Sequence, residues 1–308
     1  MKNKNIIEVT DFSPKEWCNL INETIEFKKN KLRKKKILDN KLVGLLFDNN
    51  SLRTRVSFEA ATHLLGGDSY FISTSSVTHE NDGTKRESYE DILETLDRMV
   101  DIYVIRDYSQ ELLEVIKRKN FPPFINGFCS TGHPSQALAD LSVIKWKRHT
   151  LDLNYAAVCP SNGSGVIESF VYGVLILGKR ITIITNTGKF KGKNKNFWRE
   201  VNRLTNAYGG EINITRNLTE VIKSCDVLYV DEWWENSSDF LKRKIGKYRV
   251  DEKFLKNSKP DLSILHCLPA HAEREITEKV LRGQQSIIFD QAEFRLYSAM
   301  SLLSFLAK

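Results

Sequence analysis

Apolar and polar residues alternate along the chain in blocks that predict strands and helices in regular succession. Short apolar runs bounded by turn residues are typical of buried strands, whereas longer stretches with apolar residues three and four positions apart are typical of helices. In the first half of the chain, this pattern predicts strands at 42–47, 68–72, 102–106 and 124–126. It predicts helices there at 13–36, 53–65, 88–99, 110–117 and 135–147.

The same alternation restarts after residue 149. Strands are predicted at 155–159, 180–184, 211–214, 227–230, 262–265 and 286–289, and helices at 164–177, 194–208, 219–224 and 292–307. Strands that alternate with helices form parallel sheets covered by helices on both faces. A chain of 308 residues is also long enough for two hydrophobic cores, because single cores stop growing at roughly 250–300 residues.

We therefore predict an α/β protein with two doubly wound, Rossmann-like parallel-sheet domains and a cleft between them. The first domain is expected at 1–145 and the second at 146–290. The last helix, within 291–308, is expected to pack back on the first domain. Ligands of such sheets bind at the carboxyl ends of the strands, so polar residues just after each strand are the first to consider.

The segment Ser51-Leu52-Arg53-Thr54-Arg55 lies between the first predicted strand and the helix that follows it. A helix that begins there points unpaired backbone N–H groups and the positive end of its dipole at the turn. Guanidinium and hydroxyl groups in the first helical turn add further donors, which suits a phosphate dianion. An N-capping serine followed by a solvated basic helix face would give the same local sequence, so the rest of the chain has to decide.

Charge and composition exclude several classes of protein. Much of the net charge of +7 comes from two basic segments, 28–36 and 189–195, which lack the aromatic platform of a nucleic-acid-binding surface. We interpret both as solvated surface and expect no nucleic-acid partner. No apolar stretch approaches the roughly 18–20 residues that span a bilayer and no signal-peptide core follows Met1, so we expect a cytoplasmic protein without a membrane partner. The five cysteines are scattered without a paired spacing, which indicates neither disulfides nor a zinc site.

Four further segments follow predicted strands or lie at the start of predicted helices. Arg106 ends a strand, and His133 and Gln136 lie in a His-Pro-Ser-Gln turn that opens a helix. Cys267 lies in the segment His-Cys-Leu-Pro-Ala after a strand, and Arg295 lies near the start of the last helix. In order and spacing, from about residue 42 to residue 302, these segments together with the first one resemble the aspartate and ornithine carbamoyltransferase family. The His-Cys-Leu-Pro-Ala segment resembles the ornithine branch.

The resemblance implies a transferase that moves the carbamoyl group of carbamoyl phosphate to a primary amine, ornithine or a close analogue, and releases phosphate. It assigns carbamoyl phosphate binding to Ser51, Leu52, Arg53, Thr54, Arg106, His133, Gln136, Cys267, Leu268 and Arg295. The catalytic residues among them are Arg106, His133, Cys267 and Arg295. Attack of the amine builds negative charge on the carbamoyl oxygen, which Arg106 and His133 can stabilise as an oxyanion hole. The resemblance further implies a homotrimer that needs neither a metal nor a cofactor.

The acceptor side departs from the family pattern. The ornithine branch carries Asp-x-x-x-Ser-Met-Gly where this chain has Asp231 followed by Glu-Trp-Trp-Glu-Asn-Ser, so the aspartate matches and the Ser-Met pair does not. By alignment, Glu168 stands at an acceptor-contacting asparagine. The resemblance assigns acceptor binding to Asp231, Glu168, Glu235, Asn236 and Cys267. Extra carboxylates favour an acceptor with an added cationic group or without a carboxylate, unless Glu235 points to solvent; both alternatives stay open.

Other functions compete with this interpretation. One is a family member specific for a different diamine or modified amino acid, and another is a non-catalytic paralog that binds or assembles. A paralog without turnover has no physical need for the full arginine and histidine set. A dinucleotide-dependent oxidoreductase would share the fold, but no G-x-G-x-x-G follows an early strand. The loop 73–86, which in the family reaches a neighbouring subunit's active site, matches poorly and offers only Lys85 and Arg86 for that role.

Overall fold

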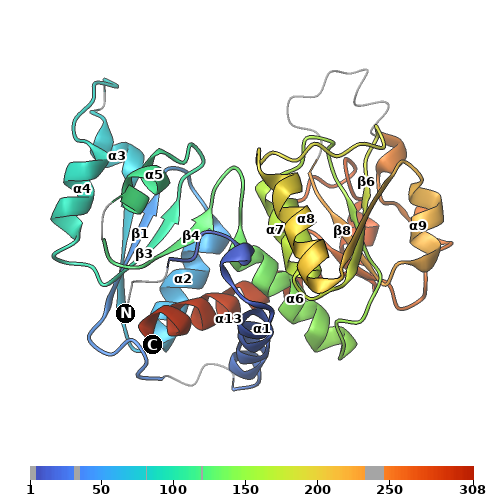
Figure 1. Cartoon of the computed structure of the whole chain (residues 1–308), viewed down its shortest axis with the longest axis horizontal. Helices are drawn as coiled ribbons and strands as arrows, with labels where there is room; N and C mark the ends of the chain where they lie inside the picture. Colours follow the sequence, from blue (N-terminus) through green and yellow to red (C-terminus); the bar gives the residue numbers. More distant parts are fainter. Residues whose placement is uncertain (1–4, 31–34, 81, 119–120, 233–245) are drawn as a thin grey trace.

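The computed structural model describes residues 5–30, 35–80, 82–118, 121–232 and 246–308. Within them the chain forms two parallel β-sheets flanked by helices, which confirms the predicted α/β class (Figure 1). The first sheet has the strand order β2-β1-β3-β4, and the second has the order β7-β6-β5-β8-β9. In each sheet the order of strand addition reverses beside the strand that comes first in the chain, β1 or β5. Open α/β sheets bind ligands at this point.

The strands of the first sheet are β1 (Leu42–Phe47), β2 (Asp68–Ser73), β3 (Ile102–Arg106) and β4 (Phe124–Phe128). Those of the second sheet are β5 (Tyr155–Val158), β6 (Arg180–Ile184), β7 (Glu211–Thr215), β8 (Val227–Val230) and β9 (Ser263–Leu265). All residues of β5 and β8, at the centre of the second sheet, are buried. Burial on both faces explains why such strands have continuous apolar sequences.

The strands of the first sheet alternate along the chain with α2 (Leu52–Leu64), α3 (Thr74–Thr78), α4 (Tyr89–Leu96), α5 (Glu111–Arg118) and α6 (Pro134–Arg148). The second sheet alternates with α7 (Gly165–Leu175), α8 (Phe197–Tyr208), α9 (Leu218–Ser224), α11 (Glu252–Leu255) and α12 (Glu278–Leu281). Near the chain ends lie η1 (Val9–Asp11), α1 (Pro14–Lys29) and α13 (Ile288–Ala307), and a further 3₁₀ turn, η2 (Gly246–Tyr248), precedes α11.

The last helix, α13, packs mainly beside α1, α2 and α6 (Figure 1). Ser298 on α13 donates to the backbone carbonyl of Ser135 at 3.1 Å, and the hydroxyls of Thr24 and Ser301 are 3.0 Å apart. The chain therefore returns to the helices of the first sheet after it has completed the second. This return carries Arg295 to the carboxyl ends of the first sheet's strands.

Two predicted elements differ from the structure. The predicted strand at 286–289 is wrong, because only Ser286 pairs with a strand residue and α13 begins at Ile288. Ile287 and Ile288 are apolar because they are buried where the two hydrophobic cores meet, not because they extend the sheet. The N-terminal helix was predicted to reach residue 36 but ends at Lys29, since the charged stretch that follows offers little apolar surface to pack.

The two domains meet where α7 begins. Gly165, the first residue of α7, lies so close to the loop 129–133 that a Cβ there would be 2.6 Å from the backbone nitrogen of Gly132. One turn later, the hydroxyl of Ser169 accepts the backbone N–H of His133 at 2.8 Å and lies 2.7 Å from the carboxylate of Glu8. The start of the second domain thus packs directly on the loop that carries His133.

Candidate active site

The anion-binding turn predicted after β1 forms the first turn of α2. Ser51 is the N-cap, and its hydroxyl accepts the backbone N–H of Thr54 at 3.4 Å. Arg53 extends toward the second domain, where its Nη2 donates to the carbonyl oxygen of Leu268 at 2.7 Å. Partial burial lowers the pKa of Arg53, but a guanidinium remains charged at neutral pH. A fixed positive charge therefore lies at the amino end of a helix, between the domains.

The other residues of this turn point elsewhere. Arg55 pairs with Glu59 one helical turn later at 2.9 Å, and its guanidinium lies 3.7 Å from the centre of the Phe71 ring. The side chain of Leu52 is 76% exposed, so only its backbone can serve an anion at the turn. Of the two arginines in the motif, Arg53 contacts the described part of the second domain and Arg55 pairs within its own helix.

Arg106 lies at the end of β3, beside the first turn of α2. Its guanidinium carbon is 4.4 Å from the centre of the Phe128 ring, at the end of β4. Burial lowers the pKa of Arg106, and nearby Asp48 partly offsets this effect. Its Nε is buried and donates to no other residue that the structure describes. Such an unpaired buried N–H costs free energy in the folded protein.

Arg295 reaches the same place from α13 and joins three segments. Its Nη1 lies 2.9 Å from Nε2 of His133 and also donates to Oε1 of Gln136. Its Nη2 donates to the hydroxyl of Thr54 at 3.2 Å. Burial lowers the pKa of Arg295 to about 10, so the side chain stays protonated at neutral pH. The first turns of α2 and α6 are therefore connected through one buried guanidinium.

His133 is neutral in this cluster. Burial lowers its pKa well below the usual value, and the positive charges of Arg295, Arg106 and Arg53 lower it further. A guanidinium can only donate, so Nε2 of His133 accepts from Arg295. The ring proton is then assigned to Nδ1, which lies 3.3 Å from the hydroxyl of Ser135. In this tautomer Nε2 is an acceptor. Donation from Nε2 to a carbamoyl oxygen would require the tautomer with the proton on Nε2.

Two residues that sequence reasoning did not select, Asp140 and Gln291, support this cluster from behind. Asp140 accepts from the amide nitrogens of Gln136 at 2.7 Å and of Gln291 at 2.6 Å. The amide oxygen of Gln291 accepts the backbone N–H of His266, in the second domain, at 2.9 Å. Burial raises the pKa of Asp140 to about 7. Helical spacing was the available signal, since Asp140 lies one turn after Gln136 and Gln291 one turn before Arg295.

The loop after β9 is shaped by a buried pair, His266 and Glu275. His266 Nε2 lies 3.1 Å from the Glu275 carboxylate, and its Nδ1 accepts the backbone N–H of Leu268 at 2.9 Å. This places the carbonyl of Leu268 where Arg53 donates to it. Cys267 lies between His266 and Leu268 in the chain, and desolvation together with nearby carboxylates raises the pKa of its thiol. Cys267 is therefore a neutral thiol and not a reactive thiolate.

Two of the three described acceptor residues, Asp231 and Glu168, are bonded within the second domain. Asp231 follows β8 and is buried, and Ser164, the N-cap of α7, donates to its Oδ2 at 2.8 Å. Burial raises the pKa of Asp231. Glu168 is fully buried, and its carboxylate accepts the backbone N–H groups of Lys193 and Asn194, the second at 3.0 Å. Burial raises the pKa of Glu168 to about 7. Glu168 thus anchors the loop that follows β6.

Two of the remaining residues selected from the sequence, Lys85 and Arg86, lie outside this cluster. Glu235 and Asn236 fall outside the described residues. Lys85 and Arg86 are exposed in the loop after α3, where Arg86 lies 3.7 Å from the carboxylate of Glu80. The structure therefore gathers the predicted carbamoyl phosphate set and provides only part of the predicted acceptor set.

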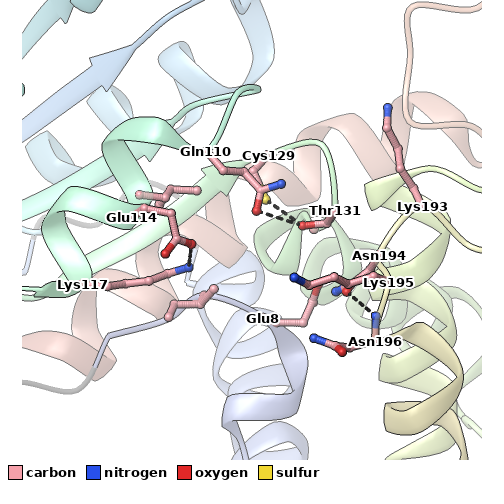
Figure 2. A pocket seen from close by; sticks show the side chains of 13 residues that line it. Glu8, Gln110, Glu114, Lys117, Cys129, Thr131, Lys193, Asn194, Lys195 and Asn196 are labelled. Carbon is pink, nitrogen blue, oxygen red and sulfur yellow. Dashed lines mark hydrogen bonds and ion pairs between the residues drawn. The ribbon is translucent and has the colours of Figure 1, made fainter.

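A separate cavity of about 560 Å³ lies beside the cluster, between the two domains (Figure 2). It is lined by residues from α5 and from the loops 129–132 and 193–196, together with Glu8. None of the described site residues lines it. In the described part of the chain, His, Cys, Asp and Glu side chains form no group that could hold a metal ion. No helix there is both long and apolar enough to cross a membrane.

Comparison with known proteins leads to one family. Residues 4–146 match the carbamoyl-P binding domain, and residues 152–306 the Asp/Orn binding domain, of aspartate/ornithine carbamoyltransferase. The chain is 33% identical to an ornithine carbamoyltransferase from Methanococcus aeolicus, over 98% of this chain and 99% of that protein. The solved structure of anabolic ornithine carbamoyltransferase from Campylobacter jejuni is similar, with a TM-score of 0.87 and 29% identity over 98% of this chain and 99% of that one.

A structure of N-acetyl-L-ornithine transcarbamylase resembles the chain in fold, with a TM-score of 0.85 and 22% identity over 98% of this chain and 99% of that one. The fold and the site define an α/β protein that gathers buried arginine side chains between two parallel-sheet domains. The chain belongs to the aspartate/ornithine carbamoyltransferase family and is a carbamoyltransferase.

Proposed function

We propose that this enzyme transfers the carbamoyl group of carbamoyl phosphate to the primary amine of ornithine or a close analogue, giving a ureido product and phosphate. The observation that carries the proposal is the convergence of Arg53, Arg106, Arg295 and His133 from four separate segments. Carbamoyl phosphate has a dianionic end and a polar carbamoyl end, and this set offers charged donors to both. The substrates are accordingly two small molecules.

The phosphate end is assigned to the first turn of α2. The capped turn at Ser51 presents free backbone N–H groups, and the helix dipole favours an anion there. Arg53 adds a fixed charge, and the hydroxyl of Thr54 adds a donor that is already held by Arg295. Neutralisation of the phosphate lowers the barrier to its departure, because negative charge accumulates on it as the C–O bond breaks.

The carbamoyl end is assigned to Arg106 and its neighbours. Attack of a neutral amine forms a C–N bond and pushes an electron pair onto the carbamoyl oxygen. Collapse of this intermediate breaks the bond to phosphate, which leaves with the electron pair and can accept the proton that the amine loses. The charged guanidinium of Arg106 is assigned to this oxygen. The reaction as written needs no covalent enzyme intermediate, so Cys267 is assigned a contact role.

His133 is assigned a second, conditional donor role. In the structure its Nε2 accepts from Arg295, so it donates to the carbamoyl oxygen only if the bound substrate draws Arg295 away and the ring proton moves to Nε2. Gln136, whose amide is held by Asp140 and Arg295, is assigned to the carbamoyl group. Orientation of two bound substrates would supply much of the remaining acceleration.

A second candidate is the same transfer to a different amine. Two carboxylates beyond Asp231 suggested this from the sequence, but Glu168 is occupied by the backbone of the loop after β6. Only Glu235 and Asn236, in place of the Ser-Met pair, still favour another acceptor. Ornithine is therefore our first acceptor, and a diamine or a modified amino acid is the second.

Homotrimeric assembly and a cytoplasmic location stay predictions. In favour of assembly, Leu52, Val56 and Tyr70 are large apolar side chains with exposed fractions of 76%, 53% and 57%, on α2 and the neighbouring edge strand β2. Exposed apolar side chains that lie together commonly mark a protein interface. Analytical ultracentrifugation of the purified protein tests the assembly directly.

The proposed function is tested by incubating the purified protein with carbamoyl phosphate and one amine at a time. Ornithine, N-acetylornithine, lysine and putrescine form the panel, and both phosphate release and ureido product are measured. We expect ornithine to give the highest kcat/KM. A higher value for another amine would select the second candidate. No ureido product with any amine would reject both and favour a binding paralog.

A further inference from the structure

Lys193 in the second domain reaches across to Tyr108 in the first. Its Nζ lies 2.5 Å from the Tyr108 hydroxyl and 4.7 Å from the centre of the ring. Figure 2 shows the Lys193 side chain turned away from the other side chains that line the interdomain cavity. The contact therefore joins the loop after β6 to the loop after β3, beside the cavity that Lys193 helps to line.

Tyr108 is continuous with the carbamoyl phosphate site. Its ring stacks on Phe128, with 6.1 Å between the centres and 27° between the planes. The guanidinium of Arg106 lies 4.4 Å from the centre of the same Phe128 ring, and the ring of His133 meets it edge-on at 5.2 Å. The backbone N–H of Tyr108 also donates to the carboxylate of Asp48 at 2.7 Å. Burial lowers the pKa of Arg106, and the charge of the same carboxylate partly offsets this effect. Any displacement of Tyr108 thus reaches Arg106 through one shared ring.

The Lys193 end is fixed to the second domain. The carboxylate of Glu168, fully buried in α7, accepts the backbone N–H groups of Lys193 and Asn194. Gly192 turns the chain just before them with a φ of 77°, and a Cβ there would be 2.9 Å from Phe197. The loop therefore has a defined position in its own domain, while its lysine side chain bonds the other domain.

We propose that Lys193 and Tyr108 form an interdomain latch that positions Arg106 for carbamoyl phosphate. This rests on the proposed function, because it assigns a positioning role at the same site. Neither residue touches the reacting atoms. The cation over the ring and the contact with the hydroxyl hold Tyr108 against Phe128, and Phe128 in turn supports the guanidinium of Arg106. Pre-organised donors bind more tightly than donors that have to be ordered on binding.

The experiment uses the full chain and four variants. Lys193→Met removes the charge and keeps the aliphatic stem, whereas Tyr108→Phe removes the hydroxyl and keeps the stack. The third variant combines both changes. Lys195→Met is the matched control, because it removes an exposed lysine two residues away in the same loop. The readouts are KM for carbamoyl phosphate, kcat, KM for the amine, the Kd for inorganic phosphate by calorimetry, and the midpoint of thermal unfolding.

We expect Lys193→Met to raise KM for carbamoyl phosphate and the Kd for phosphate about fivefold, and Tyr108→Phe about threefold, as befits a cation–π contact and its hydrogen bond. We expect kcat within about twofold of wild type, an unchanged KM for the amine, and a double variant no worse than Lys193→Met, because both changes break one contact. Lys195→Met should match the wild type.

Several results would overturn the latch. Effects that simply add in the double variant would indicate that the two residues act independently, and an equal loss in Lys195→Met would indicate a general charge effect. A lower unfolding midpoint with unchanged KM and Kd would indicate a merely structural contact. A wild type that neither turns over any amine nor binds phosphate would reject the proposed function itself. If the wild type binds phosphate without turnover, an unchanged Kd in Lys193→Met still rejects the latch.

Discussion

The proposed carbamoyl phosphate side and the proposed acceptor side of the site are built differently. On the first side, Arg295 from α13 bonds Thr54 on α2 and Gln136 on α6 directly, so three helices share one buried network. On the second side, Asp231 and Glu168 are each bonded by polar groups of their own domain. One side is a network that depends on the docking of several elements, and the other consists of separate local anchors.

This difference separates transfer from the choice of acceptor. A shared network loses several bonds when one member is removed, so substitutions there should affect the chemistry strongly. A locally bonded carboxylate can be altered without disturbing the phosphate site, so substitutions there should affect the amine alone. A site built in this way can change its acceptor and still transfer the carbamoyl group.

The largest loss of kcat/KM should come from Arg53→Met, with Arg55→Met as its matched control. Arg53 contacts Leu268 across the domains and faces the proposed phosphate, whereas Arg55 pairs with Glu59 in its own helix. We expect Arg53→Met to lower kcat/KM for carbamoyl phosphate about 100-fold or more, as is typical when a charged donor to developing charge is lost. Arg55→Met should stay within about threefold of wild type in the same steady-state assay. Equal losses would mean that the motif acts through its overall charge.

The second-largest effect on turnover is expected from Asp140→Ala, with Asp140→Asn as its matched control. Alanine leaves the amides of Gln136 and Gln291 without their acceptor, and each unpaired buried donor costs about 1–3 kcal/mol. We expect a lower unfolding midpoint and a loss of kcat of about tenfold, because Gln136 is no longer oriented. Asparagine keeps an acceptor oxygen and should recover most of kcat. Failure of asparagine to do so would show that the charge of Asp140, and not its hydrogen bonds, supports the cluster.

On the acceptor side, Ser164→Ala should raise KM for the amine about fivefold and leave KM for carbamoyl phosphate unchanged. Ser164 donates to Asp231, and one lost hydrogen bond to a charged group has about this effect. Ser164 also caps α7, so the variant should lose about 1 kcal/mol of stability. Ser88→Ala removes the equivalent cap of α4 and is the control. An identical KM shift in both variants would assign the effect to helix stability.

The smallest effect on turnover is expected from Glu168→Gln, which should change the pH dependence of stability. Burial raises the pKa of Glu168 in the folded protein to about 7, above the roughly 4.3 of an unfolded chain. Between these values the folded state binds more protons, so the free energy of unfolding falls as the pH rises, by roughly 1 kcal/mol per pH unit. Relative to the glutamine variant, the wild type should lose stability from about pH 5 to pH 7 and then level off. Urea unfolding at four pH values measures the difference, and a flat difference would contradict it.

The fold was predictable wherever one local pattern decided the structure. The apolar run 42–47 is buried between two neighbouring strands, and Ser51 caps the helix after it, as the sequence indicated. The run 286–289 carries the same apolar signal but begins a helix, because its burial comes from the junction of two cores. Apolar periodicity reports that a segment is buried, and it does not report what buries it.

The sequence indicated which residues belong to the candidate site, but not which of them form hydrogen bonds with one another. Asp140 and Gln291 stand in the same motifs as Gln136 and Arg295, yet their contact joins residues 151 positions apart in the chain. Glu168 stands by alignment at an acceptor-contacting position, and the structure adds that its carboxylate accepts the backbone N–H of Lys193 in the loop after β6. Spacing along a helix shows which residues share a face, but the partner on the other side comes from another part of the chain.

The amino-acid sequence alone determined the order of strands and helices, the helix-capped anion turn and the set of charged residues at the carboxyl ends of the strands. These depend on short-range patterns: apolar period, capping and turn chemistry. The tertiary structure decided that Arg53 and not Arg55 contacts the second domain, that Arg295 joins α2 to α6, and that Lys193 meets Tyr108. These depend on how helices and loops dock, where long-range packing sets direction and distance.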